Sequence, residues 1–105
     1  MLTTVTAPRR IAFRRIAEAA IPHATVLVPR WLPGGRREGV EWVTLNPMRD
    51  DHRRGSFKIN MKRWSDFATG AAGGDLVALA SYLFRLKQGE AAKKVAEALG
   101  IAAYD

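Results

Sequence analysis

Residues 42–75 read WVTLNPMRDDHRRGSFKINMKRWSDFATGAAGGD, and the middle of this stretch predicts a β-hairpin. In residues 56–60, two apolar side chains alternate with Lys58, so one face of the expected strand is apolar and the other is charged. Residues 62–67 are expected to be its antiparallel partner across a short turn. Residues 40–45 alternate weakly and predict a further strand before the hairpin, which indicates a small antiparallel sheet.

The chain after this hairpin is expected to be helical. Asp75 follows a Gly-Gly pair and is a good N-cap, because its carboxylate can accept a hydrogen bond from a backbone N–H of the first turn. Residues 76–86 carry apolar side chains at helical spacing. A break at Gly89 separates them from a second helix at residues 90–99, for which Gly100 is the expected C-terminal cap.

The chain before residue 40 predicts one helix and one more strand. Residues 8–20 begin with Pro8 and carry an apolar stripe at i, i+3, i+4 and i+7, which is typical of an amphipathic helix. Residues 24–28 are rich in β-branched side chains and lie between two prolines, so we expect a strand there. Pro33 and the two glycines after it indicate a turn.

Together these segments predict a single domain over residues 1–105 with an α+β fold. We expect an N-terminal helix within residues 1–22, a small, mostly antiparallel sheet within residues 24–69, and a pair of C-terminal helices within residues 75–99. A chain of 105 residues is long enough for one modest core.

Composition narrows the class of protein. There are no cysteines, which excludes disulfides and thiolate metal sites, and only two histidines, so we expect no metal and no other cofactor. No apolar run approaches the roughly 18 residues of a membrane helix, and no secretory signal is recognisable. We therefore expect a cytoplasmic, non-membrane protein, and we find no catalytic motif, so we do not expect an enzyme.

The charge of the chain is basic and unevenly distributed. The net charge is +7; residues 1–63 carry 13 Lys or Arg and 5 Asp or Glu, whereas residues 64–105 carry 4 and 5. One-sided positive charge favours an anionic partner, of which nucleic acid is the commonest. The cations expected to bind nucleic acid are Arg36 and Arg37 on the turn before residue 40, and Arg53, Arg54, Lys58, Lys62 and Arg63.

Two tryptophans are candidates for stacking on bases. Trp31 lies between two prolines in an expected loop, and Trp64 lies in the hairpin. Each hypothesis has a structural alternative. A tryptophan of a small domain is often part of its core, and a row of cations on a strand can serve only to prevent aggregation at a sheet edge.

The order and spacing of a set of framework residues resemble a known domain. These residues are Pro47, Ser56, Phe57, Trp64, Phe67, Gly70, Gly73, Gly74 and Asp75. The set resembles the zinc ribbon at the N-terminus of bacterial and phage DNA primases. The resemblance runs from about residue 42 to residue 101. At the positions of that family's four zinc ligands, this chain has Asn46, Arg49, Asp66 and Thr69.

This resemblance implies a metal-free zinc-ribbon-like fold and a function in template recognition. Metal binding supplies on the order of 10 kcal/mol of folding free energy in zinc-finger peptides, so other interactions must replace it here. We expect packing of Trp42, Phe57, Trp64 and Phe67 to replace most of it. We also expect Arg49 to pair with Asp66, with Asn46 and Thr69 adding hydrogen bonds.

The resulting hypothesis is a non-catalytic module that binds single-stranded DNA in the replication of a phage, plasmid or other mobile element. A replicative polymerase or helicase is a further expected partner. An alternative is a docking module without DNA affinity, which would present Tyr82 and Phe84 on the helix of residues 76–86. A decayed primase fragment is a third reading. The sequence leaves the oligomeric state, the base preference and the choice between DNA and RNA open.

Overall fold

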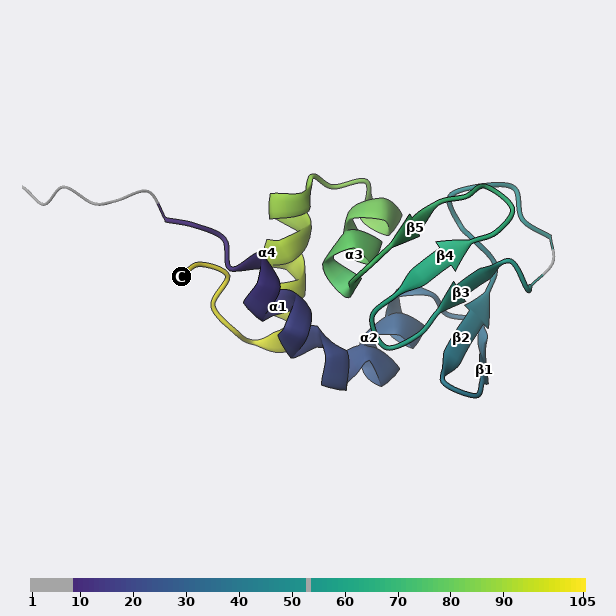
Figure 1. Cartoon of the computed structure of the whole chain (residues 1–105), viewed down its shortest axis with the longest axis horizontal. Coiled ribbons are helices and arrows are strands. Elements are labelled where there is room, and N and C mark those ends of the chain that lie inside the picture. Colours follow the sequence, from purple (N-terminus) through teal and green to yellow (C-terminus); the bar gives the residue numbers. More distant parts are fainter. Residues whose placement is uncertain (1–8, 53) are drawn as a thin grey trace, which may run out of the picture.

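The chain folds into an α+β domain in which a five-stranded antiparallel sheet stands beside a group of helices (Figure 1). The computed structural model describes residues 9–52 and 54–105. The strands follow one another across the sheet in chain order and are β1 (Arg36–Glu38), β2 (Glu41–Thr44), β3 (Phe57–Ile59), β4 (Trp64–Asp66) and β5 (Ala72–Gly73). The helices are α1 (Phe13–Ala20), the 3-10 turn η1 (Ile21–His23), α2 (Ala24–Trp31), α3 (Leu76–Phe84) and α4 (Gln88–Leu99).

The fold class predicted from the sequence is confirmed, because an N-terminal helix, an antiparallel sheet and two C-terminal helices are all present. The two ends of the described chain also meet. The backbone N–H of Ala12 donates to the carbonyl of Ala103 at 2.9 Å, and Ile11 forms an isolated bridge with Tyr104. In the part of the chain that is described, no helix has both the length and the apolar character needed to span a membrane.

The strand predicted at residues 24–28 is wrong, because this segment lies in helix α2. Its buried residues are Ala24, Leu27 and Val28, which have helical spacing, whereas the β-branched Val26 is 53% exposed. Pro29 lies inside the helix, yet the backbone N–H of Leu32 still bonds the Val28 carbonyl at 2.9 Å. Burial of one helical stripe therefore outweighs the local preference for a strand.

Two short strands were missed. Strand β1 contains Arg36 and Arg37, which were expected on a turn because they follow Pro33 and two glycines. The residues of β1 are all exposed and show no apolar alternation. Strand β5 has only two residues and lies within the glycine-rich segment. Both are edge strands, so each pairs on one side only, and their pairing depends on the neighbouring strand more than on their own sequence.

One face of the sheet, called here the inner face, is covered by helices and holds the core. The register pairs Trp42 with Ile59 and Ile59 with Trp64, so these side chains form a row across β2, β3 and β4. Phe57 is fully buried and meets the Trp64 ring edge-on, with ring centroids 6.3 Å apart. Apolar residues of α1, α2, α3 and α4 complete the same cluster.

Trp64 is also packed directly against the backbone of β5. A Cβ atom added to Gly73 would lie 2.4 Å from Trp64 Nε1, so only glycine fits opposite this ring. The Trp64 Nε1 atom is buried without a hydrogen-bond partner in the described structure. The close approach explains why a glycine occupies the position opposite Trp64 in the register.

Phe67 was expected in the core, and this prediction is wrong, because the side chain is 74% exposed. Phe67 is the first residue after β4, and its neighbour Asp66, the last residue of that strand, is fully buried on the inner side. The Phe67 backbone N–H donates to the Ser56 carbonyl at 2.9 Å, which extends the β3–β4 pairing by one step. The Phe67 ring therefore lies at the surface, directly after the buried Asp66 carboxylate.

The ends of the C-terminal helices largely follow the predicted signals. Asp75 caps α3 and accepts a hydrogen bond from the Ala78 N–H at 2.7 Å. Gly100 has a φ of 69°, and the Ile101 N–H bonds the Ala96 carbonyl at 3.0 Å, as in a Schellman cap. The break between α3 and α4 comes earlier than Gly89, at the left-handed residue Arg85 (φ 53°). These helices place Tyr82 next to the sheet.

Candidate nucleic-acid interface

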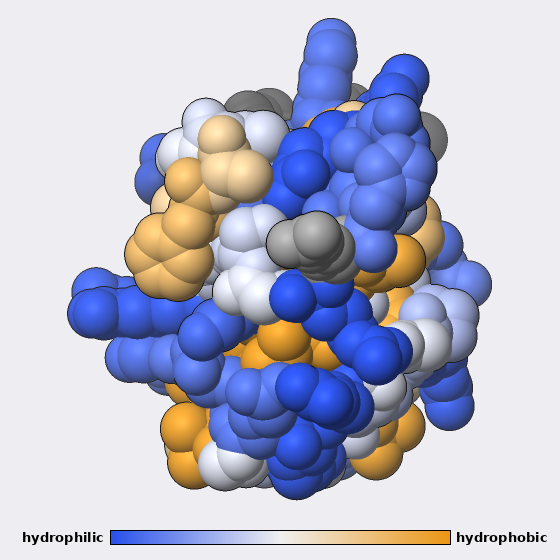
Figure 2. All heavy atoms as spheres, turned by 90° about the vertical axis from the view of Figure 1, so that its right-hand side faces the viewer, coloured by the Kyte–Doolittle hydropathy of each residue, from blue (hydrophilic) through white to orange (hydrophobic). Residues whose placement is uncertain are grey.

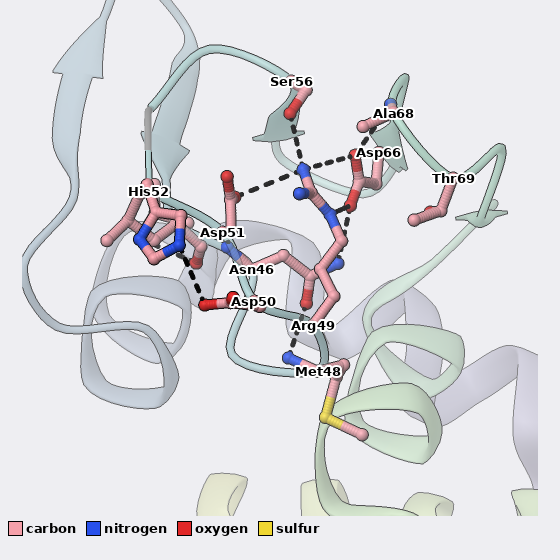
Figure 3. Close-up of polar contacts among 12 residues, drawn as sticks. Asn46, Met48, Arg49, Asp50, Asp51, His52, Ser56, Asp66, Ala68 and Thr69 are labelled. Atoms are coloured by element: carbon pink, nitrogen blue, oxygen red, sulfur yellow. Dashed lines mark hydrogen bonds and ion pairs between the residues drawn. The ribbon is translucent and has the colours of Figure 1, made fainter.

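Arg49 and Asp66, two of the four positions expected to replace zinc ligands, form an ion pair (Figure 3). Asp66 is the last residue of β4, and its side chain is fully buried. Arg49 comes from the loop between β2 and β3. Its Nε donates to Asp66 Oδ2 at 2.6 Å, and its Nη2 donates to Oδ1 at 3.1 Å. This two-bond geometry is the strongest form of an arginine–carboxylate contact.

Asn46 connects this pair to a helix. Its Nδ2 donates to Asp66 Oδ2 at 2.7 Å and to the Tyr82 hydroxyl oxygen of α3 at 2.9 Å. Its Oδ1 accepts from the Met48 N–H at 2.8 Å, so the buried amide is bonded at both ends. The Ala68 N–H donates to Asp66 Oδ1 at 2.9 Å. One carboxylate therefore holds together the loop, β4 and α3.

Two further side chains complete the surroundings of the Arg49 guanidinium. Its Nη2 lies 2.7 Å from Ser56 Oγ and 3.3 Å from Asp51 Oδ2. Asp51 Oδ2 also accepts from the Asn46 backbone N–H at 2.9 Å. The loop between β2 and β3 is therefore fixed at its beginning, its middle and its end.

The electrostatics of the pair follow from these contacts. The hydrogen bond from Arg49 holds the pKa of Asp66 well below its usual range, against the opposing effect of burial, and the bond from Asn46 adds to the lowering. The pKa of Arg49 is raised, chiefly by its hydrogen bond to Asp66. Both groups are charged at neutral pH.

Thr69, the fourth of these positions, lies apart from the cluster (Figure 3). Its hydroxyl oxygen accepts a bond from the Ala71 N–H at 3.3 Å. The expectation that its side chain supports the ion pair is wrong, because it closes its own turn instead. Its backbone does contribute, since the Thr69 and Gly70 N–H groups donate to the Asp66 carbonyl at 3.3 and 2.8 Å. Within residues 9–52 and 54–105, no group of three or more His, Cys, Asp or Glu side chains could hold a metal ion.

The opposite face of the sheet, called here the outer sheet face, carries part of the predicted basic cluster. The register pairs Arg36 with Val43, Val43 with Lys58 and Lys58 with Ser65, so these residues form a row. Val43 in this row is 2% exposed and Lys58 is half-buried, so Arg36 is the exposed cation of the row; none of these four residues belongs to the core cluster that the helices and the inner face form. Arg36 Nε donates to Glu38 Oε2 at 2.8 Å on the surface.

The exposed Phe67 lies at one end of this outer sheet face. It is two residues beyond Ser65, the partner of Lys58, which makes it a diagonal neighbour of that lysine. Phe67 was not among the residues expected at a binding surface. It is the first residue after β4, next to the inward-facing Asp66, and its N–H still bonds the Ser56 carbonyl.

The remaining predicted cations are spread around the sheet. Lys62 and Arg63 are exposed on the β3–β4 turn, where their backbone N–H groups bond Asn60 Oδ1 at 2.9 and 2.7 Å. Arg37 shares the inner-face row with Trp42, because the two are paired in the register. Arg54 Nη1 donates to the Gly34 carbonyl at 3.0 Å. Arg53 lies outside the described residues.

The surface at this end of the molecule is mostly hydrophilic. Figure 2 views it from the side of the loop between β2 and β3, and only scattered apolar side chains interrupt the polar surface. The predicted cations that the structure describes are spread over β1, β3, the β3–β4 turn and the β2–β3 loop and do not form a single compact cluster.

Neither predicted stacking tryptophan is free to bind a base. Trp31 lies in α2 and not in a loop; it is partly buried and meets Phe84 edge-on, with centroids 5.9 Å apart. Trp64 is 5% exposed, and its ring centroid is 4.8 Å from that of Tyr82. The expectation that Trp31 lies in a loop is therefore wrong, and the burial of Trp64 argues against its stacking on a base.

The alternative function, a docking surface on α3 that presents Tyr82 and Phe84, is not supported at Tyr82. Its ring packs on Trp64, and its hydroxyl is bonded to Asn46, so α3 does not present it to a partner. Phe84 is 37% exposed but is flanked by Trp31 and by the Lys94 ammonium, which lies 4.6 Å from its ring centroid.

Comparison of the chain with protein-family models gives no match, and comparison with curated proteins gives none either. The case for a function therefore rests on the residues and their geometry.

Proposed function

We propose that the chain is a non-catalytic module that binds single-stranded nucleic acid, most readily DNA, with its outer sheet face. One arrangement carries the proposal: the half-buried Lys58 lies in the outer row of the sheet, and Phe67, whose ring is 74% exposed, directly follows the end of β4, two residues beyond the Ser65 that pairs with Lys58. Cations beside an exposed aromatic ring are the combination that single-strand binding proteins use, since cations contact phosphates and the ring stacks on a base.

The spacing of the outer sheet face suits a single strand better than a duplex. Adjacent strands lie about 4.8 Å apart, so Arg36 and Lys58, which are separated by β2, lie roughly 10 Å apart. Phe67 lies about 7 Å along the sheet from the Lys58–Ser65 pair. A flexible single strand can adjust its phosphates and one base to such points, whereas bases stacked inside a duplex cannot reach Phe67.

The buried Arg49–Asp66 pair supports the same proposal indirectly. It ties the loop between β2 and β3 to β4 and bonds Ser56, whose carbonyl accepts from Phe67. We propose that it takes over the positional role that a zinc ion has in the primase zinc ribbons that this chain resembles. The module would then recognise template for a replicative enzyme of a phage, plasmid or other mobile element.

The test is the affinity of matched variants for a labelled single strand of about 20 nucleotides, which exceeds the site of one small domain. Lys58→Ala should weaken binding and reduce the slope of log Kd against log salt by about 0.7 to 1. Phe67→Ala should cost about 1–3 kcal/mol of binding free energy and leave that slope unchanged. Melting temperatures show that both variants are folded.

The chain offers matched controls on α1. Arg14→Ala removes the same charge, and Phe13→Ala removes an aromatic ring that is 44% exposed. If these two variants weaken binding as much as Lys58→Ala and Phe67→Ala do, affinity follows overall charge and the outer sheet face is not the site.

A further inference from the structure

A hollow separate from the outer sheet face opens between α2 and two β-turns. Its volume is about 130 Å³. Its lining includes the buried Val28 and Ile59 and, at the two turns, the exposed Val40 and Met61. The β1–β2 turn and the β3–β4 turn therefore each place an aliphatic side chain at the rim of the same apolar hollow.

Neither turn needs an apolar residue for its own stability. Gly39 provides the positive φ (63°) of the β1–β2 turn, yet the next residue is Val40, which is 70% exposed. Asn60 closes the other turn with its side chain, yet Met61 is 52% exposed. Single exposed aliphatic residues are common, but two that converge from separate turns on one hollow indicate a surface that becomes buried on binding.

The charges around the hollow indicate the character of the partner. Arg37 belongs to the lining, and Lys62 and Arg63 directly follow Met61. On the acidic side, Glu41 belongs to the lining, and Glu38, which is bonded to Arg36, directly precedes Gly39. An apolar hollow with an excess of cations at its rim is complementary to an apolar side chain flanked by carboxylates.

A nucleobase fits this hollow less well. The Trp42 Nε1–H is already bonded to the Leu32 carbonyl at 2.9 Å, and Asn60 Oδ1 accepts two backbone N–H groups of its own turn. Two groups that could read the edge of a base are therefore occupied. The exposed rim residues are aliphatic and offer no flat ring for stacking.

We propose that this hollow binds a peptide segment of a partner protein in which one apolar side chain is flanked by acidic residues. The apolar side chain enters between Val40 and Met61, and the carboxylates lie beside Arg37, Lys62 and Arg63. This inference does not depend on nucleic-acid binding, because the hollow and the outer sheet face are made of different side chains.

The probe is a fluorescein-labelled peptide with a single leucine between short runs of aspartate, titrated by anisotropy and followed by ¹⁵N chemical shifts. The peptide should bind, with shifts at residues 39–41 and 60–63, and replacing its leucine by alanine should weaken binding about fivefold or more. Met61→Ser and Val40→Ser should each weaken binding about tenfold. Val26→Ser is the matched control, since Val26 is an equally exposed aliphatic residue that does not line the hollow.

Several results would overturn the proposal. It fails if the leucine and alanine peptides bind equally, or if Met61→Ser and Val40→Ser, folded by their melting temperatures, have no more effect than Val26→Ser. It also fails if Met61→Ser abolishes self-association of the free protein, which would assign the hollow to a second copy of the chain. Loss of affinity for a labelled oligothymidylate in Met61→Ser, without loss of peptide binding, would assign the hollow to nucleic acid. DNA binding by the outer sheet face can succeed or fail independently of each result.

Discussion

Replacing Asp66 by alanine tests whether a buried ion pair holds this fold together without metal. The substitution removes one acceptor that serves Arg49 Nε, Arg49 Nη2, Asn46 Nδ2 and the Ala68 N–H. The guanidinium keeps its contacts with Ser56 and Asp51 but loses its closest counter-charge.

The magnitude follows from burial. Removing one partner of a buried ion pair costs about 3–5 kcal/mol, because the other charge stays behind uncompensated. The Arg49 side chain is 23% exposed and retains Asp51, so we expect the lower end, about 3 kcal/mol. For a domain of this size, that loss lowers the melting temperature by roughly 10–25 °C.

The assay is urea unfolding followed by circular dichroism, with Asp50→Ala as the matched control. Asp50 lies on the same loop, but its side chain is 89% exposed and its carboxylate lies 3.1 Å from the exposed His52, so its loss should change stability by less than about 0.5 kcal/mol. A double variant that also carries Arg49→Ala should be more stable than the two single costs predict, because neither charge is stranded. If Asp66→Ala stays within about 1 kcal/mol of the native chain, the pair is not what fixes the loop.

Three further outcomes are expected. The pKa of Asp66 is lower in the folded than in the unfolded chain, so its contribution is complete above about pH 4 and is lost as the pH falls further; the unfolding free energy should therefore drop more steeply in acid for the native chain than for Asp66→Asn. Gly73→Ala should destabilise by about 1–3 kcal/mol in thermal unfolding, because the new Cβ meets Trp64, whereas Gly74→Ala, which meets nothing within 4 Å, should not. Asp75→Ala should cost about 1 kcal/mol in urea unfolding through loss of the α3 N-cap, and an unchanged midpoint would contradict that role.

The sequence predicts the elements that carry their own local signal. The Phe57–Ile59 alternation, the Asp75 cap and the Gly100 cap are all found where the pattern places them. Helix α2 is the main failure, because the β-branched residues and flanking prolines of residues 24–28 favour a strand locally. Its helical form is decided by the burial of Leu27 and Val28 against the rest of the core.

In the candidate site, too, one feature was expected from the sequence and another was not. The Arg49–Asp66 contact was expected from the primase resemblance, and the structure contains it. The exposed aromatic residue was not expected, because both Trp64 and Phe67 were assigned to the core. Trp64 shares the inner side of β4 with the buried Asp66, whereas Phe67 is the first residue after the strand and is exposed.

We propose that the outer sheet face binds single-stranded nucleic acid, and this can be tested on the unmodified protein. The most direct measurement is a fluorescence anisotropy titration of labelled single-stranded and duplex DNA of equal length, at about 50 mM and about 200 mM salt. We predict tighter binding to the single strand, with an affinity that falls steeply as salt increases. Absence of binding to either DNA at the lower salt would contradict the claim, and the basic surface would then have no role in recognising nucleic acid.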